Sequence, residues 1–125
     1  MSGIFNSNVN TEIVLGPCLY DEHDVMTMSW DELLENTELS VMEDGTLTSD
    51  NGSGYSGSTR TKLQALTGKL IIPNNVKAIG RYAFYLCRGL TSVTIPDSVI
   101  SIDYSAFFVC EGLKRLPNSV LSLLL

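Results

Sequence analysis

Apolar residues in the C-terminal half of the chain follow a pattern that recurs after 23 positions. Residues 71–93 align with residues 94–116 without a gap, and a third copy begins at residues 117–120, two positions early. The same residue recurs at the paired positions Val76/Val99, Ile79/Ile102, Ala83/Ala106, Phe84/Phe107, Cys87/Cys110 and Leu90/Leu113. A fixed period of this length is typical of a solenoid, in which each coil buries its apolar face only against its neighbours.

Each copy has an alternating part and a more widely spaced part. In the coil that begins at Leu90, polar residues separate the apolar residues 90, 93 and 95, which predicts a short strand that ends at Pro96. Apolar residues within 106–110 then stand at i, i+1 and i+4, which favours a helical or 3₁₀ turn. Gly112 allows a tight return to the next strand, because glycine has no Cβ.

The N-terminal half lacks this period, and its clearest element is a short helix over about residues 30–36. Ser29 and Glu32 have the spacing of a capping box, in which the serine is the N-cap and the glutamate is the third helical residue. The apolar stripe at i, i+3 and i+4 consists of Trp30, Leu33 and Leu34. We expect Trp30 to dock this helix on the rest of the molecule or to contact a partner, since tryptophan is enriched at interfaces.

Two other N-terminal segments have the character of strands. Residues 11–15 form a short strand candidate that is closed by Gly16 and Pro17. Residues 39–48 predict a β-hairpin in which Asp44-Gly45 supplies both positive-φ positions of a type I′ turn.

The segment between the hairpin and the repeats is rich in glycine and serine. We therefore divide the chain into an acidic N-terminal cap or docking region (1–48), a linker (49–61) and the repeats (62–125), with a degenerate first coil over 63–70. The predicted fold is an α/β solenoid, a short stack of coils with parallel strands and a small α+β cap. An apolar fraction of 44% is sufficient for a packed core.

Charge is distributed unevenly between the two halves. Residues 1–60 carry a net charge of −10 and residues 61–125 a net charge of +4, which gives −6 for the whole chain. This asymmetry indicates an interaction between the halves or with a partner, or else a solvated acidic surface. The acidic total and the few bases among the repeat aromatics argue against nucleic-acid binding.

The chain shows neither a long apolar stretch nor a signal peptide. No segment reaches the roughly 18 apolar residues of a membrane span, and the first residues lack the basic and apolar regions of a secretory signal. We expect the protein to be made in the cytoplasm. Incorporation into a virion is one expected destination, and the cell surface is the alternative.

The chain offers little catalytic or metal-binding chemistry. The cluster with metal-ligand character is Asp21, Glu22, His23 and Asp24, and its consecutive side chains point in different directions. A solvated acidic loop is the main interpretation, and a small metal-binding protein or enzyme centred on His23 is the alternative. The G-x-G-x-x-G of residues 52–57 lacks a buried strand before it and an acid about 20 residues later, so no nucleotide or other cofactor is expected.

The three cysteines form no metal-binding pattern. Cys87 and Cys110 stand at equivalent repeat positions, and stacked strands lie ~4.8 Å apart, within the range of Cα separations that disulfides tolerate. A disulfide between them is one interpretation, and a pair of small apolar thiols in the core is the other.

The motif Ile-Pro-Asp-Ser-Val-x-x-Ile-x-x-x-Ala-Phe-x-x-Cys-x-x-Leu of residues 95–113 resembles the BspA-like class of leucine-rich repeat. Residues 72–90 match it at nearly every position, and the resemblance covers about residues 70–120. It implies a right-handed solenoid with a sheet of short parallel strands on one side. It also implies a binding role, often that of a surface protein or adhesin, and carries no catalytic motif.

We therefore expect a non-enzymatic protein-interaction or structural subunit, part of a larger assembly such as a phage or virion accessory protein. An adhesin-like protein or fragment is the alternative. Because the third copy is short and leucine-rich, we expect self-association or assembly through the C-terminal end of the repeats. The expected partner-binding residues are Trp30, Tyr55, Tyr82, Tyr85, Tyr104, Phe108, Leu121, Leu123, Leu124 and Leu125.

Overall fold

A computed structural model describes residues 16–113 of the chain. The strand candidate at 11–15, the third repeat copy and the C-terminal leucines (Leu121, Leu123, Leu124 and Leu125) lie outside the described residues. Within residues 16–113, neither helix has the length and apolar character needed to cross a lipid bilayer.

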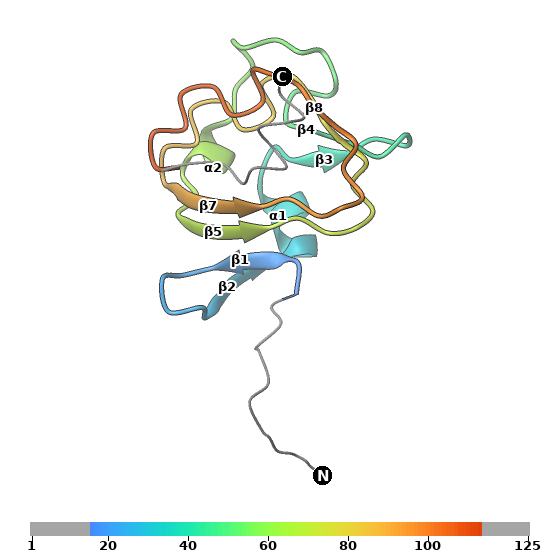
Figure 1. The fold of residues 1–125 in the computed structure, drawn as a ribbon. Coiled ribbons are helices and arrows are strands. Elements are labelled where there is room, and N and C mark those ends of the chain that lie inside the picture. The colour runs from blue at the N-terminus through green and yellow to red at the C-terminus, as the bar shows by residue number, and fades with distance from the viewer. Residues whose placement is uncertain (1–15, 114–125) are drawn as a thin grey trace.

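The described residues form two sheets of four strands and two short helices (Figure 1). The first sheet has the order β2-β1-β5-β7 and consists of Met26–Ser29 (β2), Cys18–Tyr20 (β1), Gly68–Ile71 (β5) and Leu90–Thr94 (β7). The second sheet has the order β3-β4-β6-β8 and consists of Ser40–Val41 (β3), Thr46–Thr48 (β4), Ala78–Ile79 (β6) and Ser101–Ile102 (β8). The helices are Trp30–Asn36 (α1) and Thr61–Gln64 (α2).

Strand pairing in both sheets reproduces the 23-residue period of the sequence. In the first sheet Leu70 of β5 lies opposite Val93 of β7, and in the second Ile79 of β6 lies opposite Ile102 of β8. Both pairs are parallel, so corresponding residues of successive repeats sit side by side. Each sheet is mixed, because the hairpins β1–β2 and β3–β4 add antiparallel strands at one side. The described residues therefore have a repeat fold, and the longer solenoid remains a prediction.

The register also identifies an insertion in the coil that precedes the first full copy. Leu47 of β4 pairs with Ile79, an offset of 32 residues, whereas Leu70 pairs with Val93, an offset of 23. The stretch from Leu47 to Leu70 is therefore nine residues longer than the equivalent stretch from Ile79 to Val93. We call residues 49–59 the inserted loop. The domain boundaries at residues 48 and 62 remain predictions, although both sheets contain strands from each side of them.

The helix predicted in the N-terminal half is present as α1 and begins with the expected capping box. The Ser29 hydroxyl accepts the Glu32 backbone N–H at 3.2 Å, and the Glu32 carboxylate accepts the Ser29 backbone N–H at 2.8 Å. The hydrogen bond from the Ser29 backbone N–H, with the Ser29 hydroxyl as a second contribution, lowers the pKa of the Glu32 carboxyl. The capping box is thus confirmed, and it satisfies two backbone N–H groups at the start of the helix.

The predicted hairpin is present as β3–β4, but the prediction that its turn is of type I′ is wrong. Such a turn needs a positive φ at both central residues, and in this segment only Gly45 has one, at +89°. The Gly45 N–H donates to the Met42 carbonyl at 2.9 Å, which fits a type I turn followed by a glycine bulge, a loop one residue longer than type I′. The added residue re-aims the strand so that β4 can pair with β6.

A second hairpin, β1–β2, was not predicted. Its strands are too short to show alternation, and Gly16-Pro17 just before β1 had the character of a strand end rather than a strand entry. The Asp21 carboxylate closes the turn by accepting the backbone N–H groups of His23 at 2.8 Å and Val25 at 3.0 Å. The acidic cluster is therefore a hairpin turn.

The prediction of a helical or 3₁₀ turn in each repeat is also wrong. The chain between β6 and β7, and after β8, passes through consecutive turns instead. Tyr82, Leu86 and Val109 have φ values of +59°, +60° and +60°. Each such residue leaves the right-handed region and so interrupts a helix before it can propagate.

The repeat glycines are required by close packing between coils. A Cβ on Gly89 would lie 2.4 Å from the Leu66 carbonyl oxygen, and a Cβ on Gly112 would lie 2.4 Å from the Arg88 carbonyl oxygen. Neither glycine has a positive φ, so the neighbouring coil, and not the conformation of the return, excludes a side chain.

Replacing Gly89 with alanine is therefore expected to lower the free energy of unfolding by about 1–3 kcal/mol, because the two coils must separate locally. Urea unfolding followed by circular dichroism measures this change. Gly16→Ala is the matched control, since no atom lies within 4 Å of the added Cβ. Equal stability of the two variants would contradict the packing explanation.

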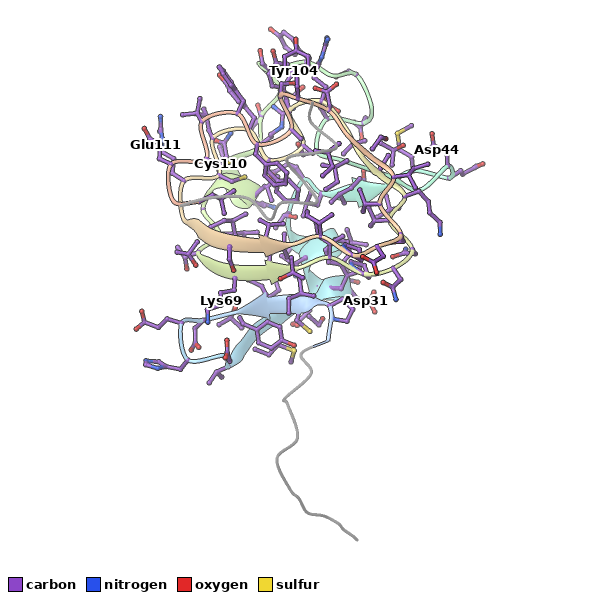
Figure 2. The ribbon with its side chains drawn as sticks, in the orientation of Figure 1. Asp31, Asp44, Lys69, Tyr104, Cys110 and Glu111 are labelled. Carbon is purple, nitrogen blue, oxygen red and sulfur yellow. The ribbon has the colours of Figure 1, made fainter. Side chains whose placement is uncertain are left out.

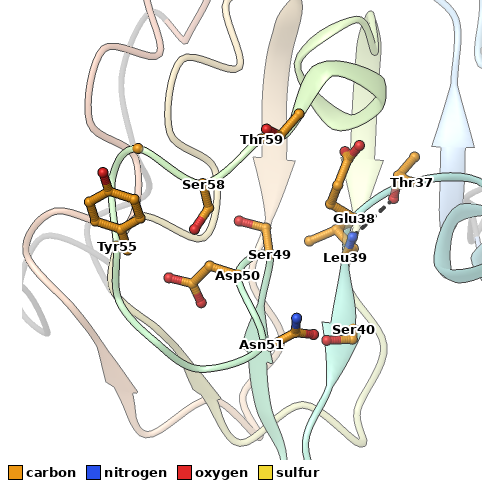
Figure 3. Close-up of a pocket in the computed structure, with 11 residues that line it drawn as sticks. Thr37, Glu38, Leu39, Ser40, Ser49, Asp50, Asn51, Tyr55, Ser58 and Thr59 are labelled. Atoms are coloured by element: carbon orange, nitrogen blue, oxygen red, sulfur yellow. Dashed lines mark hydrogen bonds between the residues drawn. The ribbon is translucent and has the colours of Figure 1, made fainter.

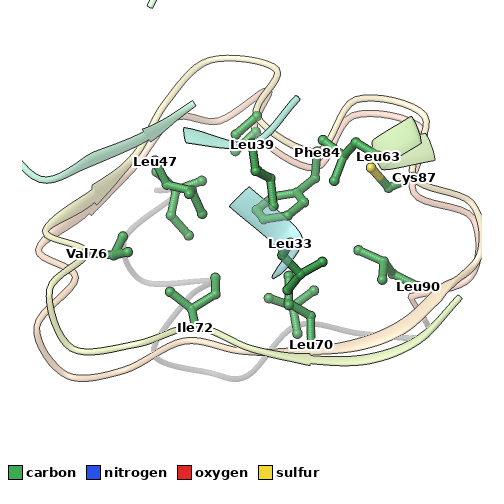
Figure 4. Close-up of a cluster of buried hydrophobic side chains, with 14 of the residues drawn as sticks. Leu33, Leu39, Leu47, Leu63, Leu70, Ile72, Val76, Phe84, Cys87 and Leu90 are labelled. Carbon is green, nitrogen blue, oxygen red and sulfur yellow. The ribbon is translucent and has the colours of Figure 1, made fainter. Parts of the chain in front are cut away.

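Within residues 16–113, one hydrophobic cluster joins the two sheets (Figure 4). It draws on both halves of the chain, from Leu33 of α1 and Leu47 of β4 to the repeat residues around Phe84. Phe84 is fully buried and stacks on Phe107, its equivalent in the next repeat, with ring centroids 5.2 Å apart. The identical spacing of the repeats thus stacks a buried ring on a partly buried ring of the next coil.

Candidate functional site

The turns on one side of the repeats bring three predicted partner-binding aromatics together. We call Tyr82, Tyr85 and Phe108 the aromatic patch. Tyr85 and Phe108 occupy equivalent repeat positions and stack nearly parallel at 5.7 Å, and Tyr82 meets them edge-on at 5.3 and 6.3 Å. Phe108 is 53% exposed, so a large apolar ring on this surface faces water.

Tyr104 lies in the same repeat as Phe108 and is 77% exposed (Figure 2). Its turn is held by Asp103, whose carboxylate accepts the Ser105 backbone N–H at 2.9 Å and the Ser105 hydroxyl at 2.6 Å. Partial burial raises the pKa of Asp103, but these hydrogen bonds and the nearby Arg81 outweigh that effect and lower it. Tyr104 is thus presented on an ordered turn.

The inserted loop is held by one buried side chain, Arg60, which is 1% exposed. Its guanidinium donates to the Ser49 hydroxyl at 2.5 Å and to the Asp50 carboxylate at 3.4 Å. The remaining N–H groups donate to the backbone carbonyls of Tyr55, Ser56 and Ser58 at 3.0–3.3 Å. All five donors of the planar group are therefore used, which orders a sequence that would otherwise be flexible.

Arg60 also connects the inserted loop to the aromatic patch. Its guanidinium carbon lies 5.9 Å from the centre of the Tyr85 ring, and the Ser49 hydroxyl donates to the Tyr82 carbonyl at 3.3 Å. The Gln64 amide of α2 donates to the Tyr85 carbonyl at 2.9 Å. The patch therefore rests on a hydrogen-bonded base and not on a mobile surface.

A cavity of about 640 Å³ opens between the inserted loop and the start of β3 (Figure 3). We call it the loop cavity. Its lining is mostly polar and comes from two segments of the chain, residues 37–40 on one side and residues 49–51, 55 and 57–59 on the other. Tyr55, a predicted partner-binding residue, lines it and is 64% exposed.

Trp30 lies partly buried against the core cluster, as expected of a residue that docks α1. Its indole N–H is buried without a hydrogen-bond partner among the residues that the structure describes. Among the described residues, Trp30 neither lines the loop cavity nor pairs with a ring of the aromatic patch. Its role toward a partner remains a prediction.

His23 lies exposed at the tip of the β1–β2 turn, 3.4 Å from Glu22. Asp24 is paired with Lys69 at 2.9 Å. Across residues 16–113 no group of three or more metal-ligating side chains converges. The alternative of a metal or catalytic centre at His23 therefore gains no geometric support from the described part of the chain.

The cysteines of the described residues are free thiols. Burial raises the pKa of Cys110 to about 11 and raises that of Cys87 as well. The Cys110 thiol donates to the Phe84 carbonyl at 2.9 Å. Both thiols are protonated at neutral pH and act as small apolar groups, the alternative to a disulfide stated above.

Two features of this site were not predicted from the sequence. Arg60 closes a glycine- and serine-rich segment, and this composition is typical of an exposed linker rather than of a buried side chain. One wall of the loop cavity is formed by residues 37–40. They are separated from the inserted loop in the sequence and come to face it only when the chain folds. The signal that was available is that Arg60 is the single base among the first 60 residues, where eleven acids stand.

Comparison with known proteins identifies the repeats. Residues 63–122 match the family model described as BspA type leucine rich repeat region (6 copies). No curated protein matches the chain, and no solved structure matches it. The match starts at Leu63, so it includes the degenerate first coil expected over residues 63–70. The segment from residue 63 to residue 122 is therefore a leucine-rich repeat region of the BspA type.

Proposed function

We propose that this chain is a non-enzymatic protein-binding module and that the aromatic patch, with Tyr104, is its binding surface. The family match supports a role in protein–protein interaction or adhesion. The observation that carries the proposal is the exposure of Phe108 and Tyr104, at 53% and 77%, on a well-ordered base.

Leaving these rings in water costs free energy, and a partner that covers them removes that cost. Aromatic side chains bury a large area with few rotatable bonds, so they contribute strongly to binding when a partner covers them. Phe108 is already stacked on Tyr85, and Tyr85 lies over the Arg60 guanidinium. Little conformational entropy is therefore lost when a partner binds, which favours affinity.

The charge around the patch bears on the kind of partner. Arg81 lies beside Tyr82 in sequence and is exposed, and Arg88 forms an exposed ion pair with Glu111 at 2.9 Å, linking the two repeats. A protein surface with apolar side chains and a nearby carboxylate would complement this arrangement.

Photo-cross-linking tests the proposal. A photoreactive phenylalanine analogue in place of Tyr104 is expected to capture a protein from an extract of the native cells, and mass spectrometry identifies it. The same analogue in place of Glu35, exposed on α1, is the matched control. Equal capture from both positions would contradict a binding surface at the patch.

Affinity for the captured protein then tests the individual rings. We expect Phe108→Ala to weaken binding at least tenfold, about 1.4 kcal/mol, in isothermal titration calorimetry. Glu35→Ala serves as the control and is expected to bind as the unaltered protein does. Unchanged affinity in Phe108→Ala would contradict the proposal.

A place in a larger assembly is a finer form of this proposal. Light scattering on the purified chain measures self-association, and a mass of one chain across the concentration range would argue against a second copy as the partner. Incorporation into a virion has no support in the family match, and an adhesin-like role fits the family equally well.

A further inference from the structure

Hydrogen bonds to Glu38 and Arg60 hold the two walls of the loop cavity in place. On one side, the Glu38 carboxylate accepts the backbone N–H groups of Leu63 at 2.8 Å and Lys62 at 3.3 Å, which ties residues 37–40 to the start of α2. On the other side, Arg60 holds the carbonyl groups of the inserted loop. The cavity of about 640 Å³ therefore exists before any ligand binds, and its volume lies in the range of small-molecule sites.

Several polar groups that line this cavity are unused. The side chains of Asn51, Ser58 and Thr59 make no hydrogen bond to any of residues 16–113, and neither does the Tyr55 hydroxyl. They offer an amide and three hydroxyl groups, each of which can both donate and accept. A ligand that carries several hydroxyl or amide groups would satisfy them.

The Tyr55 ring is held at the cavity by Gly57. A Cβ on Gly57 would lie 2.5 Å from the Tyr55 Cζ atom and 2.6 Å from its hydroxyl, so the ring occupies the space of the missing side chain. Gly57 does not have a positive φ, and contact with the ring is what excludes a side chain there. An exposed, positioned ring can pack against the C–H face of a sugar.

The charges of the lining select against anions. The Asp50 carboxylate is paired with the Arg60 guanidinium, and both side chains are almost fully buried. Glu38 adds a second acidic side chain to the lining, and the residues that line the cavity include neither lysine nor arginine. A phosphate or a carboxylate would meet repulsion without a compensating cation, whereas a neutral ligand would not.

We propose that the loop cavity is a second binding site, separate from the aromatic patch, and that it takes a neutral saccharide. Its hydroxyl groups are bound by Asn51, Ser58 and Thr59, and its ring packs on Tyr55. The inserted loop thus gives one coil of the repeat fold a specificity that the 23-residue pattern does not encode. This site does not depend on the function proposed for the patch.

An array of neutral, sialylated and sulfated glycans selects the ligand, and ¹H–¹⁵N NMR titration with the selected neutral oligosaccharide locates its site. We expect shifts at the amides of Asn51, Gly57, Ser58 and Thr59. Tyr55→Ala is expected to weaken binding about tenfold. Gly57→Ala is expected to weaken it as well, because it displaces the ring without removing a polar group.

Ile100→Ala is the control, since it removes an exposed apolar side chain that belongs neither to the cavity lining nor to the aromatic patch, and it is expected to leave saccharide affinity unchanged. The spectra of all variants report whether the fold is intact. The proposal is overturned if no neutral glycan binds, if sialylated or sulfated glycans bind as tightly, or if Tyr55→Ala binds as well as the unaltered chain.

Discussion

Replacing Arg60 with methionine is expected to lower the free energy of unfolding by about 3–5 kcal/mol, the usual cost of removing one partner of a buried ion pair. The Asp50 side chain is 1% exposed and would be left buried without a cation beside it. Three backbone carbonyls of the inserted loop would lose their donors as well. Such a loss is a large share of the 5–15 kcal/mol that stabilises a typical domain.

Urea unfolding of the variant, followed by the fluorescence of Trp30, measures this change. The double variant Arg60→Met with Asp50→Leu is expected to recover part of the lost stability, because the unpaired charge is then removed too. The stability of Arg60→Lys is expected to lie between that of the unaltered chain and that of Arg60→Met, since an ammonium group cannot reach all five acceptors. A loss below about 1 kcal/mol in Arg60→Met would contradict the ordering role assigned to Arg60.

Phe84→Ala is expected to lower the free energy of unfolding by a similar amount, about 3–5 kcal/mol, through the cavity it leaves. Phe84 is fully buried at the centre of the cluster that joins both sheets, and it stacks on Phe107. The neighbouring coils cannot close the gap, because their spacing is fixed by the backbone hydrogen bond from Phe84 to the Ala106 carbonyl at 2.8 Å.

Phe108→Ala is the matched control for this prediction. It removes the same number of atoms from an aromatic ring of the next repeat, but that ring is 53% exposed. We expect it to change stability by less than about 1 kcal/mol, as surface substitutions usually do. Equal losses in the two variants, measured by thermal and urea unfolding, would contradict the assignment of Phe84 to the core and Phe108 to the binding surface.

The repeats and α1 show how much of the fold local signals can predict. The 23-residue offset predicted that Ile79 and Ile102 are equivalent, and they lie opposite each other in β6 and β8. The capping box at Ser29 predicted where α1 begins. Both signals are short in range or strictly periodic, so the sequence carries them without knowledge of the fold.

The turns of the repeats were predicted less well. The spacing of Ala106, Phe107 and Cys110 fits a helical turn, yet Val109 has a positive φ and the chain continues in tight turns. Side-chain spacing reports which residues face the core, and a helix and a series of turns can satisfy the same spacing. The backbone is decided by hydrogen bonds to the next coil, such as that from Leu86 to the Phe108 carbonyl at 3.0 Å.

The sequence alone determined the repeats, their apolar positions, the helix cap and the aromatic residues that the repeats display. Only the tertiary structure decided that residues 49–59 are an insertion within a coil, that Arg60 is buried beneath them, and that a cavity lies beside Tyr55. The reason is physical. Periodicity reports which side chains must leave water, whereas a buried arginine depends on five acceptors that are brought together only when the chain has folded.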